Sequence, residues 1–242
     1  FVNCALANHT NNTHKNNFVE THNPSRYQPG NKEGSVFITG ERVIGSTLAA
    51  TVNDNNGISQ RINYQWFLNG EKLTGKRESI LRVTDTYLGG QISLTATYTD
   101  FHNYKEEITS DVTSHIATTI VYGKDELATA ITSAGAGDWI ALNSGDYDTI
   151  PELSMSEDLT LTLGEGSTAE ISGATCIVMA GDRSALVGLT FNNINIAADS
   201  TCASTGESAV YMAGDNIAIR ENNFLGEAAT LNGEIFNWIS VK

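Results

Sequence analysis

The sequence predicts an all-β protein, in which a β-sandwich is followed by the first coils of a right-handed parallel β-helix. Three observations support this prediction. Thr, Ser, Asn and Ile recur in short runs, and 22 glycines stand against three prolines, a composition typical of turn-rich β structure. Apolar and polar residues alternate along several runs before residue 117. After residue 118, a four-residue motif returns 33 positions later, which indicates stacked repeats.

The charge balance excludes one class of partner. The 242 residues contain 14 Lys and Arg against 28 Asp and Glu, a net charge of −14. This excess of acid argues against non-specific nucleic-acid binding, which needs clustered cations. We also expect no membrane span, because no apolar run approaches the roughly 20 residues that a spanning helix requires. Since the chain begins at Phe1 and reaches Lys242 within a predicted strand, we treat it as a truncated part of a longer protein.

The first 33 residues predict export followed by a linker. Residues 1–7 end in Ala-Leu-Ala, a small-x-small pattern typical of the end of a signal peptide. We therefore expect a signal peptide remnant and a secreted or cell-surface location in a bacterium. Residues 8–33 show no periodicity, and we expect a disordered linker.

Residues 34–117 predict the sandwich. The expected strands cover 35–39, 47–52, 62–68, 80–83, 92–98 and 108–114. Asn69-Gly70 is a strong signal for a two-residue hairpin, because both turn positions need positive φ. This segment contains no Cys, so Trp66 has to fill the centre by packing alone. Tyr64 and Trp66 could form a sugar platform, but their alternation favours the core.

The motifs of this segment resemble bacterial immunoglobulin-like repeats of surface and secreted proteins. The residues that carry the resemblance are Gly45, Leu48, Ala50, Tyr64, Trp66, Asp85, Gly89 and the run Thr97-Tyr98-Thr99-Asp100. The resemblance implies an immunoglobulin-like sandwich that acts as a spacer or a sugar-binding module.

Residues 118–242 predict the β-helix. Leu127, Ala130 and Ile131 fall at helical spacing, which predicts a short amphipathic helix over 124–131 that caps the first coil. A strand over 136–142 and a tight turn over 144–147 should follow. Met179-Ala180-Gly181-Asp182 then recurs as Met212-Ala213-Gly214-Asp215, and Phe191 recurs as Phe224.

The repeat predicts how the coils stack. Three apolar sets should form interior ladders: Leu159, Leu161 and Leu163; Leu186, Leu189 and Phe191; Ile217, Ile219 and Phe224. We expect residues 195–206 to loop out at one corner. The pairs Asn192-Asn193 and Asn222-Asn223 suit turn ladders, because Asn tolerates the left-handed conformation.

The parallel half resembles polysaccharide lyase family 6, which contains alginate lyases and chondroitinase B. The carrying motifs run from Glu126 to Tyr147, then Ile171-Ser172-Gly173, 186–191, 219–224, and Asn237-Trp238-Ile239-Ser240-Val241. The resemblance implies β-elimination on a uronate polysaccharide, with a Lys base, an Arg, and calcium held by an Asn and two Glu. In the family those residues lie in later coils, so we assign no catalytic residue and no metal ligand to this chain.

Two residues are candidates for substrate binding. Arg220 is a base on a predicted coil strand, and it could touch substrate or pair with a nearby acid. Trp238 could line a sugar groove or pack in the core. The neighbouring acids Asp146/Asp148 and Glu157/Asp158 suggest a glycosidase, although their predicted turn positions favour solvated or backbone-bonding roles.

Three hypotheses for function follow. The first is a secreted lyase of an anionic polysaccharide, with alginate as the leading substrate, in a parent protein that binds calcium. In that case this chain alone is inactive. The second is a β-helix glycoside hydrolase, and the third is a non-catalytic adhesin or carbohydrate-binding surface protein. The parallel half holds only four Lys and Arg against 17 Asp and Glu, which would repel a polyanion.

Two structural expectations complete the prediction. In an exported protein, Cys176 and Cys202 should form a disulfide bond that pins the inserted corner, although a buried free Cys is the alternative. The change of period near residues 115–122 predicts that the two halves fold separately, with a protease-sensitive junction.

Overall fold

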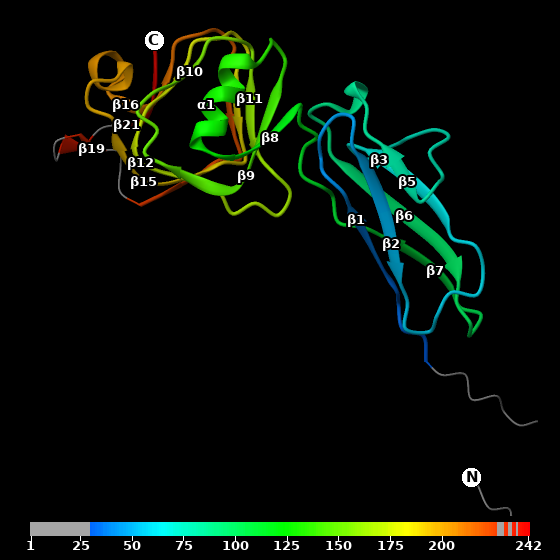
Figure 1. Cartoon of the computed structure of the whole chain (residues 1–242). Helices are drawn as coiled ribbons and strands as arrows, with labels where there is room; N and C mark the ends of the chain where they lie inside the picture. The colour runs from blue at the N-terminus through cyan, green and yellow to red at the C-terminus, as the bar shows by residue number, and fades with distance from the viewer. Residues whose placement is uncertain (1–29, 227–229, 232–233, 236) are drawn as a thin grey trace, which may run out of the picture. The chain divides into compact units, whose positions relative to one another are not determined.

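The computed structural model describes residues 30–226, 230–231, 234–235 and 237–242. It is mostly β, with antiparallel sheets before residue 117 and a curled parallel sheet after it (Figure 1). We call residues 34–117 the antiparallel half and residues 118–242 the parallel half. The predicted signal remnant and nearly all of the predicted linker lie outside the described residues.

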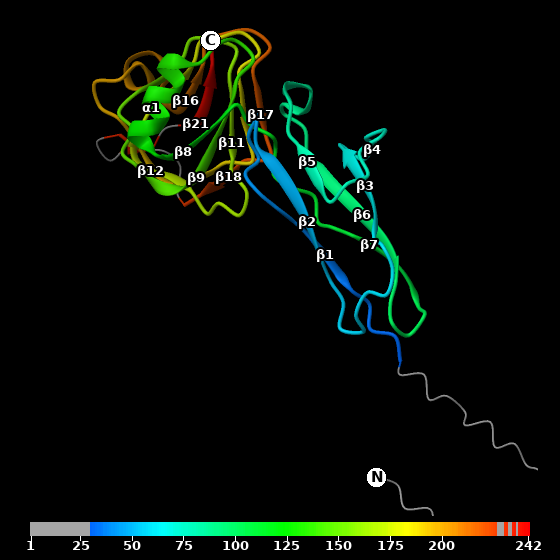
Figure 2. The same ribbon diagram turned by 45° about the vertical axis from the view of Figure 1, so that its right-hand side comes forward.

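The antiparallel half contains two sheets and a short 3-10 helix, η1 (Asp85–Tyr87). The first sheet has the order β1 (Ser35–Thr39), β2 (Thr47–Asn53) and β5 (Ile80–Arg82). The second has the order β4 (Glu71–Lys72), β3 (Asn63–Leu68), β6 (Ile92–Thr99) and β7 (Lys105–Thr109), and Figure 2 shows β4 beside β3.

One core fills the antiparallel half. In β6 every second residue is buried, from Ile92 to Tyr98, as the alternation predicts. Trp66 lies opposite Leu94 in the neighbouring strand and has no exposed surface. Its indole Nε1 donates to the backbone oxygen of Glu78 at 2.8 Å, so the buried polar atom is satisfied. Tyr64 packs against the same core, and the core interpretation of both aromatic residues is confirmed.

The predicted hairpin is confirmed. Asn69 has φ 50° and Gly70 has φ 82°, and the two residues link β3 to β4 with Leu68 opposite Glu71.

The last predicted strand of this half is displaced. We expected residues 108–114, but β7 covers Lys105–Thr109. The reason is the buried carboxylate of Asp100, whose Oδ1 accepts from the backbone nitrogens of His102 and Tyr104 and closes a tight turn. The chain therefore returns to β6 sooner than the apolar pattern suggested.

The parallel half begins with β8 (Thr119–Gly123) and α1 (Lys124–Ser133) and continues through parallel strands that enclose one core. One run of strands is β9 (Trp139–Asp148), β11 (Thr160–Leu163), β14 (Ala185–Val187) and β17 (Ala218–Arg220). A second is β12 (Glu170–Thr175), β15 (Thr190–Ile196) and β18 (Asn223–Leu225). A third is β10 (Leu153–Met155), β13 (Ile177–Met179), β16 (Ser208–Met212) and β21 (Asn237–Val241). The short β19 (Thr230–Leu231) and β20 (Glu234–Ile235) pair antiparallel, and η2 (Cys202–Gly206) is a single π-helical turn.

The 33-residue repeat equals one step of this stack. Met179 lies opposite Met212, and Phe191 lies opposite Phe224 with ring centroids 4.9 Å apart. The backbone nitrogen of Asp215 donates to the carboxylate of Asp182 at 2.9 Å, which links the two copies of the motif directly. The ladder of Ile140, Leu161, Leu186 and Ile219 runs through four strands on the core side.

The amphipathic helix is confirmed. Leu127 and Ile131 of α1 are buried in the core of the parallel half, and Ala130 packs beside them.

Three local predictions in the parallel half are wrong or incomplete. The expected turn at 144–147 lies within β9, because this strand bends from β11 to β12 and continues to Asp148. The inserted corner starts later than residue 195, since β15 runs to Ile196 in register with β12. Of the four asparagines predicted to form turn ladders, only Asn193 has a positive φ, 49°.

The predicted cysteine pair forms a disulfide bond. Cys176 and Cys202 have Cα atoms 5.6 Å apart and tie η2 to the residue before β13. Both are fully buried.

Within the described residues, no helix is both long enough and apolar enough to cross a membrane.

Candidate functional site

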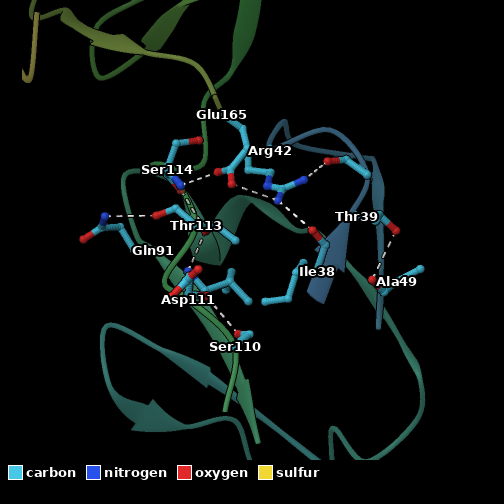
Figure 3. A network of polar contacts seen from close by, with 12 residues as sticks. Ile38, Thr39, Arg42, Ala49, Gln91, Ser110, Asp111, Thr113, Ser114 and Glu165 are labelled. Carbon is cyan, nitrogen blue, oxygen red and sulfur yellow. Dashed lines mark hydrogen bonds and ion pairs between the residues drawn. The ribbon is translucent and has the colours of Figure 1, made fainter. Parts of the chain in front are cut away.

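A polar cluster joins the two halves (Figure 3). Arg42 follows β1, and its side chain is 8 % exposed. Its Nη2 donates to the backbone oxygen of Ile38 at 3.0 Å, and its Nη1 donates to that of Gly40. The same Nη2 lies 3.2 Å from Oε1 of Glu165, which follows β11 in the parallel half. A buried cation is therefore neutralised by a carboxylate from the other half.

The second carboxylate oxygen of Glu165 extends the cluster. Its Oε2 accepts from the backbone nitrogen of Ser114 at 2.5 Å. Arg42 Nε and Ser114 Oγ are buried and make no hydrogen bond within the described part of the chain. Both residues line a cavity of about 200 Å³ together with His115, Asn143 and Glu165. A cavity of this size with polar walls suits bound water, which would satisfy the two atoms.

His115 lies at the same junction. Its ring stacks on the indole of Trp139 at the start of β9, with centroids 5.3 Å apart and an interplanar angle of 29°. Burial lowers the pKa of His115, the charge of Glu221 raises it, and the charge of Arg220 lowers it. Gly89 also faces the indole, because a Cβ there would come within 2.7 Å of the Trp139 ring.

Three small apolar residues of the parallel half are buried outside both cores. Ala141, Ala185 and Val187 are at most 4 % exposed, yet they belong to neither core cluster. The register places them in β9 and β14, where alternation points them away from Ile140 and Leu186 of the interior. Together with the polar cluster, they show that the outer side of this sheet is covered.

The structure does not bring the two predicted substrate residues together. Arg220 is exposed at the end of β17, and Trp238 lies in β21 on another sheet. The Trp238 ring packs on Phe224 with centroids 5.3 Å apart, which supports its alternative role in the core. Among the described residues Arg220 forms no ion pair, and its charge lowers the pKa of His115.

Two of the neighbouring acids, Asp146 and Asp158, are engaged by a base or by the backbone. Asp158 Oδ2 accepts from Arg183 Nε at 2.9 Å and lies 2.7 Å from Arg183 Nη2. Asp146 lies 4.0 Å from Lys124 Nζ and accepts from the backbone nitrogen of Asp148. The backbone bond of Asp146 agrees with the predicted role, whereas the ion pair of Asp158 with Arg183 was not predicted.

The described residues hold no group of three His, Cys, Asp or Glu side chains that could bind a metal ion.

Sequence reasoning missed the cluster of Arg42, Ser114, His115 and Glu165. These residues come from three separate segments of the chain, and no motif or spacing links those segments before the fold is known. Comparison of the chain with protein-family models, with curated proteins and with solved structures finds no match.

Proposed function

We propose that this chain is the N-terminal portion of a secreted bacterial lyase that cleaves a uronate polysaccharide, with alginate as its leading substrate. In this proposal the antiparallel half is an immunoglobulin-like sandwich, and the parallel half is the first part of a right-handed β-helix. The observation that carries the proposal is the 33-residue register, in which Met179 meets Met212 and Phe191 meets Phe224. This register supports the proposal, because the two motifs at 186–191 and 219–224 that resemble polysaccharide lyase family 6 lie on strands that pair with each other.

The reaction needs a base for the proton at C5, a positive charge for the carboxylate, and an acid for the leaving oxygen. By resemblance, these groups and the calcium ligands belong to coils beyond the matched motifs. Two bases of the parallel half, Arg183 and Lys124, are already paired with Asp158 and Asp146. The role of this chain is then to start the solenoid and to engage the polymer.

A non-catalytic carbohydrate-binding protein is the second candidate. The pairing of Arg183 and Lys124 favours it, because these cations then serve the fold and not a reaction. Both candidates share an acidic polysaccharide as partner and differ in whether the polymer is cut.

The test is a product assay on alginate and on dermatan sulfate with calcium. We expect no ultraviolet absorbance of unsaturated uronate from this chain alone, and a clear rise from a longer protein that includes the coils after Val241. New reducing ends without that absorbance would contradict the lyase and favour the hydrolase. Binding by the longer protein without either product would favour the second candidate.

A further inference from the structure

A polar groove lies on the antiparallel half, away from the cluster at the junction. It has a volume of about 380 Å³, and it is bordered by Arg61, Asn63, Thr97, Thr99, Lys105 and Glu107. These residues come from β3, β6, β7 and the segment just before β3.

The register of the sheet builds the floor of this groove. Asn63 pairs with Thr97, which pairs with Glu107, and Thr99 pairs with Lys105. Since Tyr98 points into the core, Thr97 and Thr99 point to the opposite face. One amide and two hydroxyl groups therefore stand side by side on a rigid surface, where they can bind sugar hydroxyls.

Two cations flank this floor. Arg61 and Lys105 are both exposed, and within the described residues neither side chain makes a hydrogen bond or an ion pair. In contrast, the cations Arg42, Lys124 and Arg183 each have an acidic partner.

The groove also contains two carboxylates, of which one is buried and hydrogen-bonded and the other is exposed to solvent. Glu106 is 5 % exposed and accepts from Asn31 Nδ2 at 2.7 Å, so it is already engaged on the inner side of the sheet. Glu107 is exposed on the outer face. The outer face thus presents two cations and one carboxylate.

The distribution of charge favours this half for contact with a polyanion. Residues 34–117 carry seven Lys and Arg against nine Asp and Glu, whereas residues 118–242 carry four against 17. An acidic polymer is repelled much less by the antiparallel half.

We propose that this groove binds two linked uronate residues of an acidic polysaccharide. Arg61 and Lys105 pair with the carboxylates, and Asn63, Thr97 and Thr99 bind ring hydroxyls. Arg61 lies just before β3 and Lys105 begins β7. These two strands flank β6, so they are separated by two strand spacings, about 10 Å. The inference rests on the proposed function for its ligand class, but it assigns binding to the antiparallel half and not to the coils.

The test is calorimetric titration of the full chain with alginate octasaccharide, using two charge-matched variants. Arg61→Ala/Lys105→Ala removes the groove cations. Lys76→Ala/Arg77→Ala removes an exposed basic pair of the same half that lies outside the groove. We expect the groove variant to bind at least tenfold more weakly and the control variant to stay within twofold of the unaltered chain. A neutral cello-oligosaccharide of equal length should not bind.

Equal losses of affinity in the two variants would show an effect of net charge alone and would overturn the proposed binding in the groove. Unaltered affinity of the groove variant would overturn it as well, and so would the absence of binding by the unaltered chain. Thermal unfolding of each variant checks that the antiparallel half is intact. Thr97→Val removes a proposed hydroxyl contact without a change of charge, and it should also weaken binding. Binding in the groove without cleavage by the longer protein would contradict the lyase and leave this inference standing.

Discussion

At the scale of single residues, His115 predicts a pH dependence of stability. Burial lowers its pKa in the folded protein below the usual 6.5. Between the folded and unfolded pKa values the unfolded chain binds more protons, so the stabilisation is complete above pH 6.5 and is lost as pH falls below it. Chemical denaturation at several pH values should therefore show that, as pH falls below 6.5, the free energy of unfolding decreases less in His115→Phe than in the unaltered chain.

His102 provides the matched control for this measurement. Its Nδ1 lies 4.0 Å from Asp100 Oδ2, in a turn away from the junction. We expect His102→Gln to keep the slope between pH 6.5 and 5 that His115→Phe reduces. Identical slopes for the unaltered chain and His115→Phe would contradict the role given to His115.

The disulfide bond gives a second prediction at this scale. Cys176 and Cys202 are 26 positions apart, and closing a loop of that size stabilises a protein by about 3 kcal/mol. Thiol titration of the unfolded, unreduced chain should detect two fewer thiols than titration after reduction. Equal numbers before and after reduction would show that both cysteines are free.

At the scale of elements, the glycine of the repeated motif has a steric function. A Cβ on Gly181 would come within 2.0 Å of the backbone oxygen of Glu157, in the preceding turn of the stack. Gly181→Ala should therefore destabilise the parallel half by about 1–3 kcal/mol, the usual range for overpacking. Gly135→Ala is the control, because the nearest atom to its Cβ would be 3.9 Å away. Equal melting temperatures of the two variants would contradict the close stacking.

The elements also show what could be predicted from sequence. Period-two alternation placed β6, and the recurrence of Met179 at Met212 predicted the register of the stack. Both signals are repeated over many residues, so single exceptions do not hide them. The position of β7 depended on one carboxylate, Asp100, whose hydrogen bonds closed a turn that the apolar pattern does not reveal.

The candidate sites were less predictable for a physical reason. Arg42 and Glu165 are 123 positions apart, and their pairing depends on how two separate cores meet. The groove residues Arg61 and Lys105 come to the same region only because β3 and β7 pair with β6 on either side. Neither set forms a motif along the chain, so neither could be found before the sheets were assembled.

At the scale of the whole molecule, two cores are joined by a buried connection. Ile116 and Ala117 have no exposed surface, and the backbone nitrogen of Ala117 donates to the oxygen of Arg42 at 2.8 Å. The backbone nitrogen of Thr118 donates to Trp139 at 2.8 Å. These contacts argue against the protease-sensitive junction that we expected from the change of period.

The connection predicts the outcome of limited proteolysis. Residues 115–123 should resist cleavage in the unaltered chain, because their backbone is buried or paired in β8. Glu165→Ala removes the partner of Arg42 and should increase cleavage in this segment, whereas Glu157→Ala, on another turn of the same half, should not. Rapid cleavage of the unaltered chain between residues 115 and 123 would contradict the docking.

An acidic polysaccharide is the proposed partner of this chain. The most direct test is calorimetric titration of the unaltered full chain with alginate oligosaccharides at low and at high salt. We expect binding that weakens as salt screens the groove cations, with no heat from a neutral oligosaccharide of equal length. Absence of binding to alginate and to dermatan sulfate at low salt, or equal binding of the neutral sugar, would contradict it.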